Sequence, residues 1–382
     1  MSQIVDSSSV VLTTAEREFD AELVTPVISL PESIRPKAGR EHLPLLDLLR
    51  VLAAHLIVWH HLSFYGPVST VAYEWLPGPI WALSEWGRSA VQVFFVIGGF
   101  LMARSLSQQG WISVSSACRL MAKRLRRIGG PYIVLLVIAV AANATADFWM
   151  DHASISAMPS LPQFLAHVVF LQDILGYEPL TAGIWYLAID LQLGLMLLGL
   201  TMLSQRLPGK RADGPSMWVV PMLMIALFAL ASLFRFNRDP EWEEWGLFFF
   251  GSYALGVFIE GALSRRLPQS VSWAYAGLIV VALVVEWRVR LAVGLATGLV
   301  IFGGGLTGIL SAWPKNRWIQ SAANMSFSLF LIHFPVCLVV NAAFSQFALQ
   351  SPPLCLAGMA TAYALSVAAS VAFYRHVELA FR

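Results

Sequence analysis

The chain has 382 residues, of which 57% are hydrophobic and 13% are charged, and its mean hydropathy is +0.67. A water-soluble domain does not need so much apolar surface, so the composition excludes an ordinary soluble enzyme. The net charge of +2 is small, and we expect no nucleic-acid partner.

Residues 1–43 differ from the remainder because they are rich in Ser, Thr, Glu and Pro and contain no apolar run with a cleavage site. They are not a secretory signal peptide, and their composition predicts a disordered cytoplasmic tail. Residues 44–382 are predicted to form one transmembrane domain. The three cysteines, Cys118, Cys337 and Cys355, have no paired spacing, so neither a disulfide framework nor a metal site is expected.

Apolar runs of about 18–22 residues recur through this domain, and each is long enough to cross a bilayer as a helix. We therefore predict an all-α polytopic membrane protein, a bundle of ten transmembrane helices. The predicted spans are about 46–66, 88–107, 128–147, 183–203, 216–235, 246–264, 271–287, 291–312, 324–346 and 354–375. The segment 161–175 can also enter the membrane as a re-entrant or interfacial helix, which would change the number of spans by two.

The loops between these spans differ in charge. Alternate loops, beginning with 108–127, contain twelve Lys and Arg residues, whereas the long loop 148–182 contains none. Because basic loops stay on the cytoplasmic side, both termini are predicted to be cytoplasmic. Four arginines on the opposite side, Arg235, Arg238, Arg288 and Arg290, weaken this pattern, although acidic residues lie beside them.

The first span, LLDLLRVLAAHLIVWHHLSFYG, carries more polar groups than a lipid-facing helix tolerates. Arg50 and His61 are eleven residues apart, close to three full turns, so they share one face about 16 Å apart along the axis. Asp47 can neighbour Arg50, whereas His55 and His60 point elsewhere. A charge at membrane depth costs about 2.5–3.5 kcal/mol or more, so the pair should face the bundle interior.

A cation near the cytoplasmic end and a titratable base deeper in the membrane suit an activated thioester carried on a nucleotide phosphate. The alternative is an Asp–Arg pair at the interface, with histidines that only hydrogen-bond to neighbouring carbonyls.

Several segments together resemble the acyltransferase 3 family of membrane enzymes. LDLLRVLAAHLIVWHH is similar to the family's first-helix signature, with Leu48 in place of the usual Gly. Further segments match in the family's order: VQVFFVIGGFLMARSL with Gly98 where Ser is common, KRLRRIGGPY, IWYLAIDLQLGL with Asp190 where Glu is usual, SLFLIHFPV and YRHVELAFR. The resemblance covers roughly residues 44–382, and since the chain ends just after its tenth span, we expect a stand-alone membrane core.

The resemblance implies an integral membrane O-acyltransferase of a bacterial-type inner membrane. Such an enzyme moves an acyl group, most often acetyl, from cytoplasmic acyl-CoA to a hydroxyl of a saccharide or glycolipid, such as a cell-surface or exopolysaccharide unit. Acetyl-CoA or another acyl-CoA would be a co-substrate rather than a permanently bound cofactor, and polysaccharide-assembly proteins are candidate partners. A transporter that uses the same buried Arg, Asp and His to bind an anionic or acylated small molecule remains the alternative.

Roles for single residues follow from the same resemblance. His61 is the first candidate for catalysis, as a general base or as a transient acyl carrier. Asp190 is the second, either paired with His61 or positioning the acceptor. The residues expected to hold the acyl donor are Arg50, Asp47, Arg124 and Arg127. His333 and Trp185 are expected at the acceptor site. Each has a structural alternative, above all His333, which precedes Pro335 in a helix.

Overall fold

The computed structural model describes residues 42–108, 112–206 and 216–382. Because the described residues begin at 42, nearly all of the predicted tail lies outside them. The chain divides into two units between His42 and Leu43. Leu43–Arg382 forms one unit, and its described residues form helices and no strand. The predicted all-α class is confirmed.

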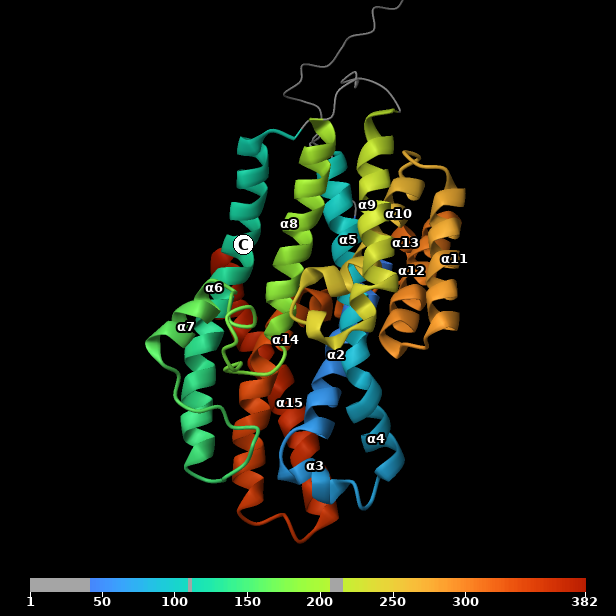
Figure 1. Ribbon diagram of the computed structural model, residues 1–382. Helices are drawn as coiled ribbons and strands as arrows, with labels where there is room; N and C mark the ends of the chain where they lie inside the picture. The colour runs from blue at the N-terminus through green and yellow to red at the C-terminus, as the bar shows by residue number, and fades with distance from the viewer. Residues whose placement is uncertain (1–41, 109–111, 207–215) are drawn as a thin grey trace, which may run out of the picture. The chain divides into compact units, whose positions relative to one another are not determined.

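Within the described ranges, nine helical stretches are long and apolar enough to cross a membrane. They contain α2 (Pro44–Phe64), α5 (Val91–Ser107), α6 (Val114–Asp147), α8 (Trp185–Gln205), α9 (Ser216–Phe234), α10 (Gly246–Leu263), α12 (Val289–Thr307), α14 (Arg317–Ser345) and α15 (Pro352–His376). The remaining predicted span, 271–287, corresponds to α11 (Gln269–Val285), which has only 17 residues. The helix order of Figure 1 therefore follows the predicted spans.

Three boundaries differ from the prediction. The second stretch begins at Pro77, because α4 (Pro77–Trp86) and the 3-10 helix η2 (Gly87–Ala90) lead directly into α5. α6 begins at Val114 rather than near 128, and Ser113 caps it by accepting a hydrogen bond from the Ser116 amide at 3.1 Å. α14 likewise begins at Arg317. Hydropathy detects only the apolar part of such a helix, so it misses a polar extension.

Shorter elements connect the long helices. They are α3 (Pro67–Ala72), α7 (Leu161–Val168), α13 (Ile309–Ala312), η3 (Phe236–Arg238), η4 (Pro240–Trp242) and η5 (Glu378–Phe381). α7, with eight residues, is about 12 Å long and cannot span a bilayer. The segment 161–175 therefore adds no span.

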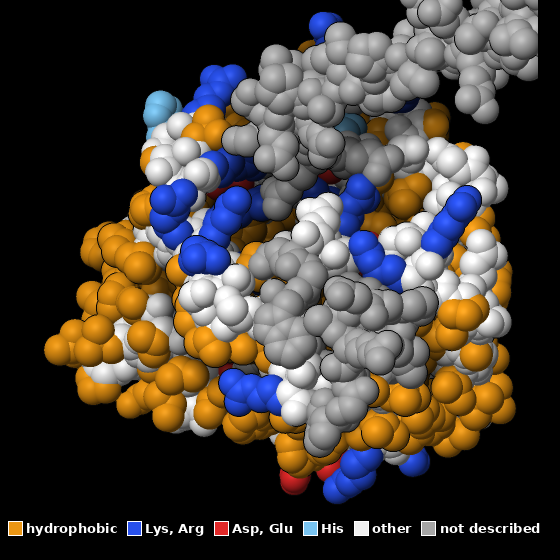
Figure 2. All heavy atoms as spheres, turned by 90° about the horizontal axis from the view of Figure 1, so that it is seen from above, with side chains coloured by type: hydrophobic (Ala, Val, Ile, Leu, Met, Phe, Trp, Pro, Cys, Tyr) orange, Lys and Arg blue, Asp and Glu red, His pale blue; other side chains and the backbone are white. Residues whose placement is uncertain are grey.

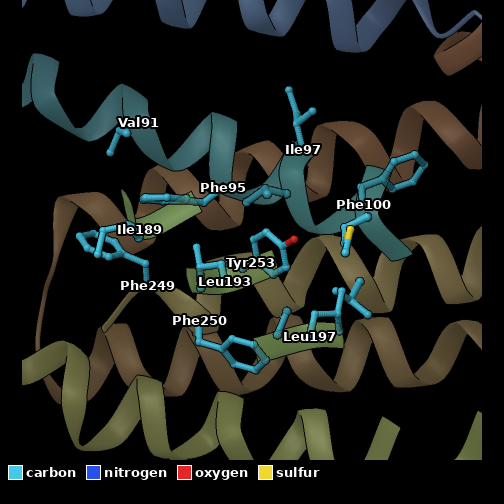
Figure 3. Packing of buried hydrophobic residues seen from close by; sticks show 14 of the residues in the cluster. Val91, Phe95, Ile97, Phe100, Ile189, Leu193, Leu197, Phe249, Phe250 and Tyr253 are labelled. Atoms are coloured by element: carbon cyan, nitrogen blue, oxygen red, sulfur yellow. The ribbon is translucent and has the colours of Figure 1, made fainter. Parts of the chain in front are cut away.

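The central packing joins α5, α8 and α10. Figure 3 shows their buried side chains meeting, among them Phe95, Leu193 and Tyr253. α5 and α10 approach each other so closely that only glycine fits at two positions. A Cβ at Gly99 would overlap the Tyr253 carbonyl, and a Cβ at Gly256 would overlap the Val96 carbonyl. Small residues let membrane helices approach in this way, so Gly99 belongs to helix packing.

One end of the bundle is basic. α6 begins, α8 ends and α9 begins at the upper end of Figure 1. Figure 2 looks onto this end, where Lys and Arg side chains gather, while hydrophobic side chains cover the flanks. Exposed Arg119, Lys123, Arg126 and Arg127 near the beginning of α6 belong to it. We call it the basic end; it is the end predicted to face the cytoplasm.

The closing motif YRHVELAFR packs back onto α6. A Cβ at Gly130 would overlap the Phe381 ring, so the glycine makes room for it. Glu378 is buried and accepts from the Ser328 hydroxyl at 2.6 Å and from Arg382 at 2.7 Å. The motif therefore has a structural role.

Candidate active site

The loop between α7 and α8 packs into the bundle rather than lying outside it. Asn143 of α6 donates to the Leu180 carbonyl at 3.0 Å, and the Leu180 amide donates to Nε2 of His167 at 3.3 Å. The Phe170 ring stacks on Tyr132, with ring centroids 4.5 Å apart. These contacts hold the end of the loop against the long helices, which brings Gly183 beside α2.

One carboxyl group of this loop, that of Asp173, has a shifted pKa. Burial raises the pKa of Asp173 to about 6, and the nearby charge of Glu244 acts in the same direction. The hydrogen bond that Gln172 donates to Asp173, at 2.9 Å, opposes this shift. Asp173 therefore becomes neutral in mildly acidic conditions, where the loop holds less negative charge.

Gly183 lies directly against the His61 ring. Its φ of +84° lies in the left-handed region, which glycine adopts without strain. A Cβ placed there would lie 3.4 Å from Cε1 of His61 and 3.6 Å from the Phe330 ring. The glycine therefore combines a required backbone conformation with close packing against the imidazole.

Replacing Gly183 by alanine tests this contact. The left-handed conformation should cost about 1–2 kcal/mol of stability for a residue with a Cβ. The new methyl group should also press against the His61 ring and restrict access to it. Gly176→Ala is the matched control, because Gly176 has a φ of +70° but no atom within 4 Å of a Cβ there. We expect both variants to lose thermal stability in detergent, and only Gly183→Ala to lose activity beyond that. Equal activity losses would contradict a role for Gly183 beside His61.

His61 and His333 form a buried pair. Nδ1 of His61, on α2, lies 2.6 Å from Nε2 of His333, on α14, and the two ring planes differ by only 3°. The exposed fractions are 6% for His61 and 0% for His333. Nδ1 of His333 lies 3.0 Å from the Leu329 carbonyl oxygen.

These contacts determine where the protons lie. A carbonyl oxygen only accepts hydrogen bonds, so Nδ1 of His333 carries a hydrogen and donates it to Leu329. In the neutral ring, Nε2 of His333 is then an acceptor, and Nδ1 of His61 must donate to it. The remaining nitrogen of His61, Nε2, therefore has a lone pair, and no described residue donates a hydrogen bond to it.

The two other histidines of α2 have partners elsewhere, as predicted. His55 bonds to the Tyr363 hydroxyl at 3.0 Å, and His60 donates to the Leu83 carbonyl at 3.0 Å. They hold α2 against α15 and α4.

Arg50 and Asp47 form the pair that their spacing predicts, with an N–O distance of 3.2 Å. Their side chains are 29% and 14% exposed, respectively. Tyr186 of α8 lies within electrostatic range of Arg50, and its ring packs on Phe330, with centroids 5.3 Å apart. Phe330 also lies beside Gly183. The rings of Tyr186 and Phe330 therefore lie between the part of α2 that carries Arg50 and the part that carries His61.

Asp190 pairs with Arg124, at 2.5 Å, rather than with His61. The side chains are 8% and 23% exposed, so this is a largely buried ion pair. A Cβ at Gly98 would lie 3.4 Å from Oδ1 of Asp190. The glycine that stands where the family commonly has serine thus borders the aspartate that stands where glutamate is usual.

The predicted site residues therefore fall into separate places. His61 and His333 meet directly, Asp47 meets Arg50, and Asp190 meets Arg124. Arg127 lies exposed at the basic end, and Trp185 lines a cavity at the opposite end of α8.

Sequence reasoning missed the two tyrosines near the Asp190–Arg124 pair. Tyr186 and Tyr253 both lie within electrostatic range of this pair. The buried hydroxyl of Tyr253 and Nε of Arg124 have no hydrogen-bond partner within the described ranges. Tyr186 directly follows Trp185 in the motif IWYLAIDLQLGL, so the motif was a signal for it, whereas Tyr253 lies in an apolar run without one.

The fold and these buried groups define a polytopic membrane protein with a polar interior that holds a hydrogen-bonded histidine pair. No curated protein and no solved structure matches the chain. The acyltransferase domain of the acyltransferase 3 family matches residues 43–374, nearly all of Leu43–Arg382. The chain belongs to this family, and the predicted membership is confirmed.

Proposed function

We propose that the protein is an O-acyltransferase of the inner membrane that moves an acyl group, most simply acetyl, from acyl-CoA to a saccharide hydroxyl. The observation that carries this proposal is the His61–His333 pair. It leaves Nε2 of His61 as a base with an unused lone pair, on a ring that packs against Gly183. Family membership supports acyl transfer as the type of reaction.

In the proposed reaction, the acceptor hydroxyl gives its proton to Nε2 of His61 while its oxygen attacks the thioester carbonyl carbon. His333 keeps the other nitrogen of His61 protonated and fixes the ring, as a positioning residue. When the tetrahedral intermediate collapses, the carbon–sulfur bond breaks and the CoA thiolate takes the proton from His61. The products are an acyl ester and free CoA, and direct transfer needs no acyl-histidine.

The acyl donor is proposed to enter from the basic end. Arg127 is exposed there, and Arg124 lies one turn away on the same helix, so both suit the nucleotide phosphates. Arg50, held by Asp47 at 3.2 Å, lies about 16 Å along α2 from His61. A long flexible arm between phosphate and thioester would bridge this distance along the rings of Tyr186 and Phe330.

The acceptor is proposed to come from the other end, past Trp185, as a sugar unit of a cell-surface or exopolysaccharide or as a glycolipid. Polysaccharide-assembly proteins would then be natural partners. His333 is buried completely and bonds to His61 and Leu329, so we now assign it to positioning His61 rather than to holding the acceptor.

The test is acyl transfer by the purified full chain in lipid vesicles. Acetyl-CoA labelled on the acetyl group is supplied outside, with candidate oligosaccharides inside or outside. We expect CoA to be released and a base-labile labelled ester to form on the saccharide. Accumulation of labelled material without CoA release or ester formation would contradict the proposal and support a transporter.

A further inference from the structure

A cavity of about 280 Å³ lies where α8 and α12 begin, at the ends of these two helices that point away from the basic end. The end of α4, η2, and the beginnings of α8 and α12 surround it, and the residues that matter here are Trp86, Arg88, Trp185, Glu243, Arg288 and Arg290. Ligand sites in proteins typically measure about 300–1,000 Å³. A cavity near the lower limit fits one small ring of a larger ligand.

The charges around the cavity do not balance. Three arginines and two glutamates line it, an excess of one positive charge. Glu243 is shared, because one of its oxygens accepts from Arg88 at 3.0 Å and the other from Arg290 at 2.7 Å. Two guanidinium groups thus depend on one carboxylate, which leaves room for a second anion.

The arginines differ in how fully they are bonded. Arg288 is buried, and its nitrogens donate to the Leu233 and Ala282 carbonyls and to Asn237, so its role is structural. Arg290 has a buried Nε without a partner within the described ranges. Arg88 is 53% exposed and donates one hydrogen bond, to Glu243. Arg88 therefore has donors that can reach an incoming anion.

Aromatic rings complete the cavity. The Arg88 guanidinium lies over the Trp185 ring, 5.1 Å from its centre, and Phe249 stacks on the same indole at 5.6 Å, so Trp185 holds Arg88 in place. Trp86 also lines the wall and is 47% exposed. A flat indole can cover the C–H face of a sugar ring, while a guanidinium binds a carboxylate through two parallel hydrogen bonds. This combination favours an acidic sugar over a neutral one.

The residues that line the cavity lie close to His61. Trp185 is two residues after Gly183, which lies against His61. Gly87, next to Arg88, lies against His60, since a Cβ there would be 2.7 Å from that of His60. Arg88 itself lies within electrostatic range of His61. A sugar bound in the cavity would therefore lie close to the base.

We propose that this cavity is an acceptor subsite for an acidic saccharide, in which Arg88 binds the carboxylate of a uronic acid and Trp86 covers its ring. The inference rests on the proposed function, whose acceptor class it names. The site is a specificity element, separate from the His61–His333 pair.

The experiment measures binding to the full chain in nanodiscs, without an acyl donor. The probes are a short β-linked glucuronic-acid oligosaccharide and the glucose oligosaccharide of the same length and linkage. We expect the acidic probe to bind roughly 10–100-fold more tightly, as one lost charge-assisted contact would predict, and added salt to weaken it. Arg88→Gln should remove this preference, Arg88→Lys should keep part of it, and Trp86→Ala should weaken the binding of both probes.

Arg235→Gln is the matched control, because Arg235 is 70% exposed, pairs with Asp239 and does not line the cavity; it should bind like the wild type. The proposal is wrong if the wild type binds both probes equally, or if Arg88→Gln keeps the preference. If the expected binding occurs without CoA release upon addition of acetyl-CoA, the subsite stands and the proposed function fails. If CoA is released while Arg88→Gln binds normally, only the subsite fails.

Discussion

Replacing His61 by alanine should lower the rate of acyl transfer by about 10²–10⁴-fold, which is the contribution of a positioned general base. The reason is that His61 has one nitrogen occupied by His333 at 2.6 Å and the other without a partner in the described part of the chain. The measurement is turnover of labelled acetyl-CoA by purified protein with a saccharide acceptor. KM for acetyl-CoA should change little, because its phosphates are proposed to bind at the arginines.

His333 variants test the positioning role separately. His333→Phe removes the acceptor for Nδ1–H of His61, so the imidazole can carry its proton on either nitrogen; we expect a loss of about 10–100-fold, smaller than the loss of the base. His333→Gln restores an acceptor oxygen and should recover part of the activity, which a purely structural role would not predict.

His55→Ala is the matched control, since His55 lies on the same helix but bonds to Tyr363. It should keep nearly normal activity. A folded His61→Ala protein that acylates at the wild-type rate would rule out His61 as the base.

The sequence was sufficient for the spans and for one helix face. Ten apolar runs predicted the long helices, and the 3.6-residue period placed Asp47 beside Arg50, as found at 3.2 Å. Such predictions succeed because hydropathy and helix geometry are local properties.

Contacts between distant helices were beyond it. His61 and His333 are 272 positions apart, and Arg124 and Asp190 are 66 apart. A single sequence gives the depth of each group but not which faces meet, so Asp190 could be placed either beside His61 or at the acceptor. The segment 161–175 was allowed to enter the membrane, but the path of the loop before α8 could not be predicted, because the buried contacts of Asn143 and His167 determine it.

Breaking the Asp190–Arg124 pair should destabilise the protein strongly. Both side chains are largely buried, and removing one partner of a buried ion pair typically costs about 3–5 kcal/mol because the other charge is left uncompensated. We expect Asp190→Asn and Arg124→Gln each to lower the thermal unfolding temperature. Tryptophan fluorescence of the protein in detergent measures this temperature. Lys123→Gln, which removes an exposed cation from the same helix, should have almost no effect.

The double variant separates stability from chemistry. Asp190→Asn with Arg124→Gln leaves no isolated charge, so it should be more stable than the sum of the two single losses predicts, by about 0.5–3 kcal/mol. Additive losses would show that the pair is not coupled. Activity should not return with stability, because Arg124 is also proposed to bind the acyl donor, and a raised KM for acetyl-CoA in the double variant would show this directly. If the stable double variant acylated normally, the pair would serve folding alone, and Arg50 and Arg127 would have to hold the donor without Arg124.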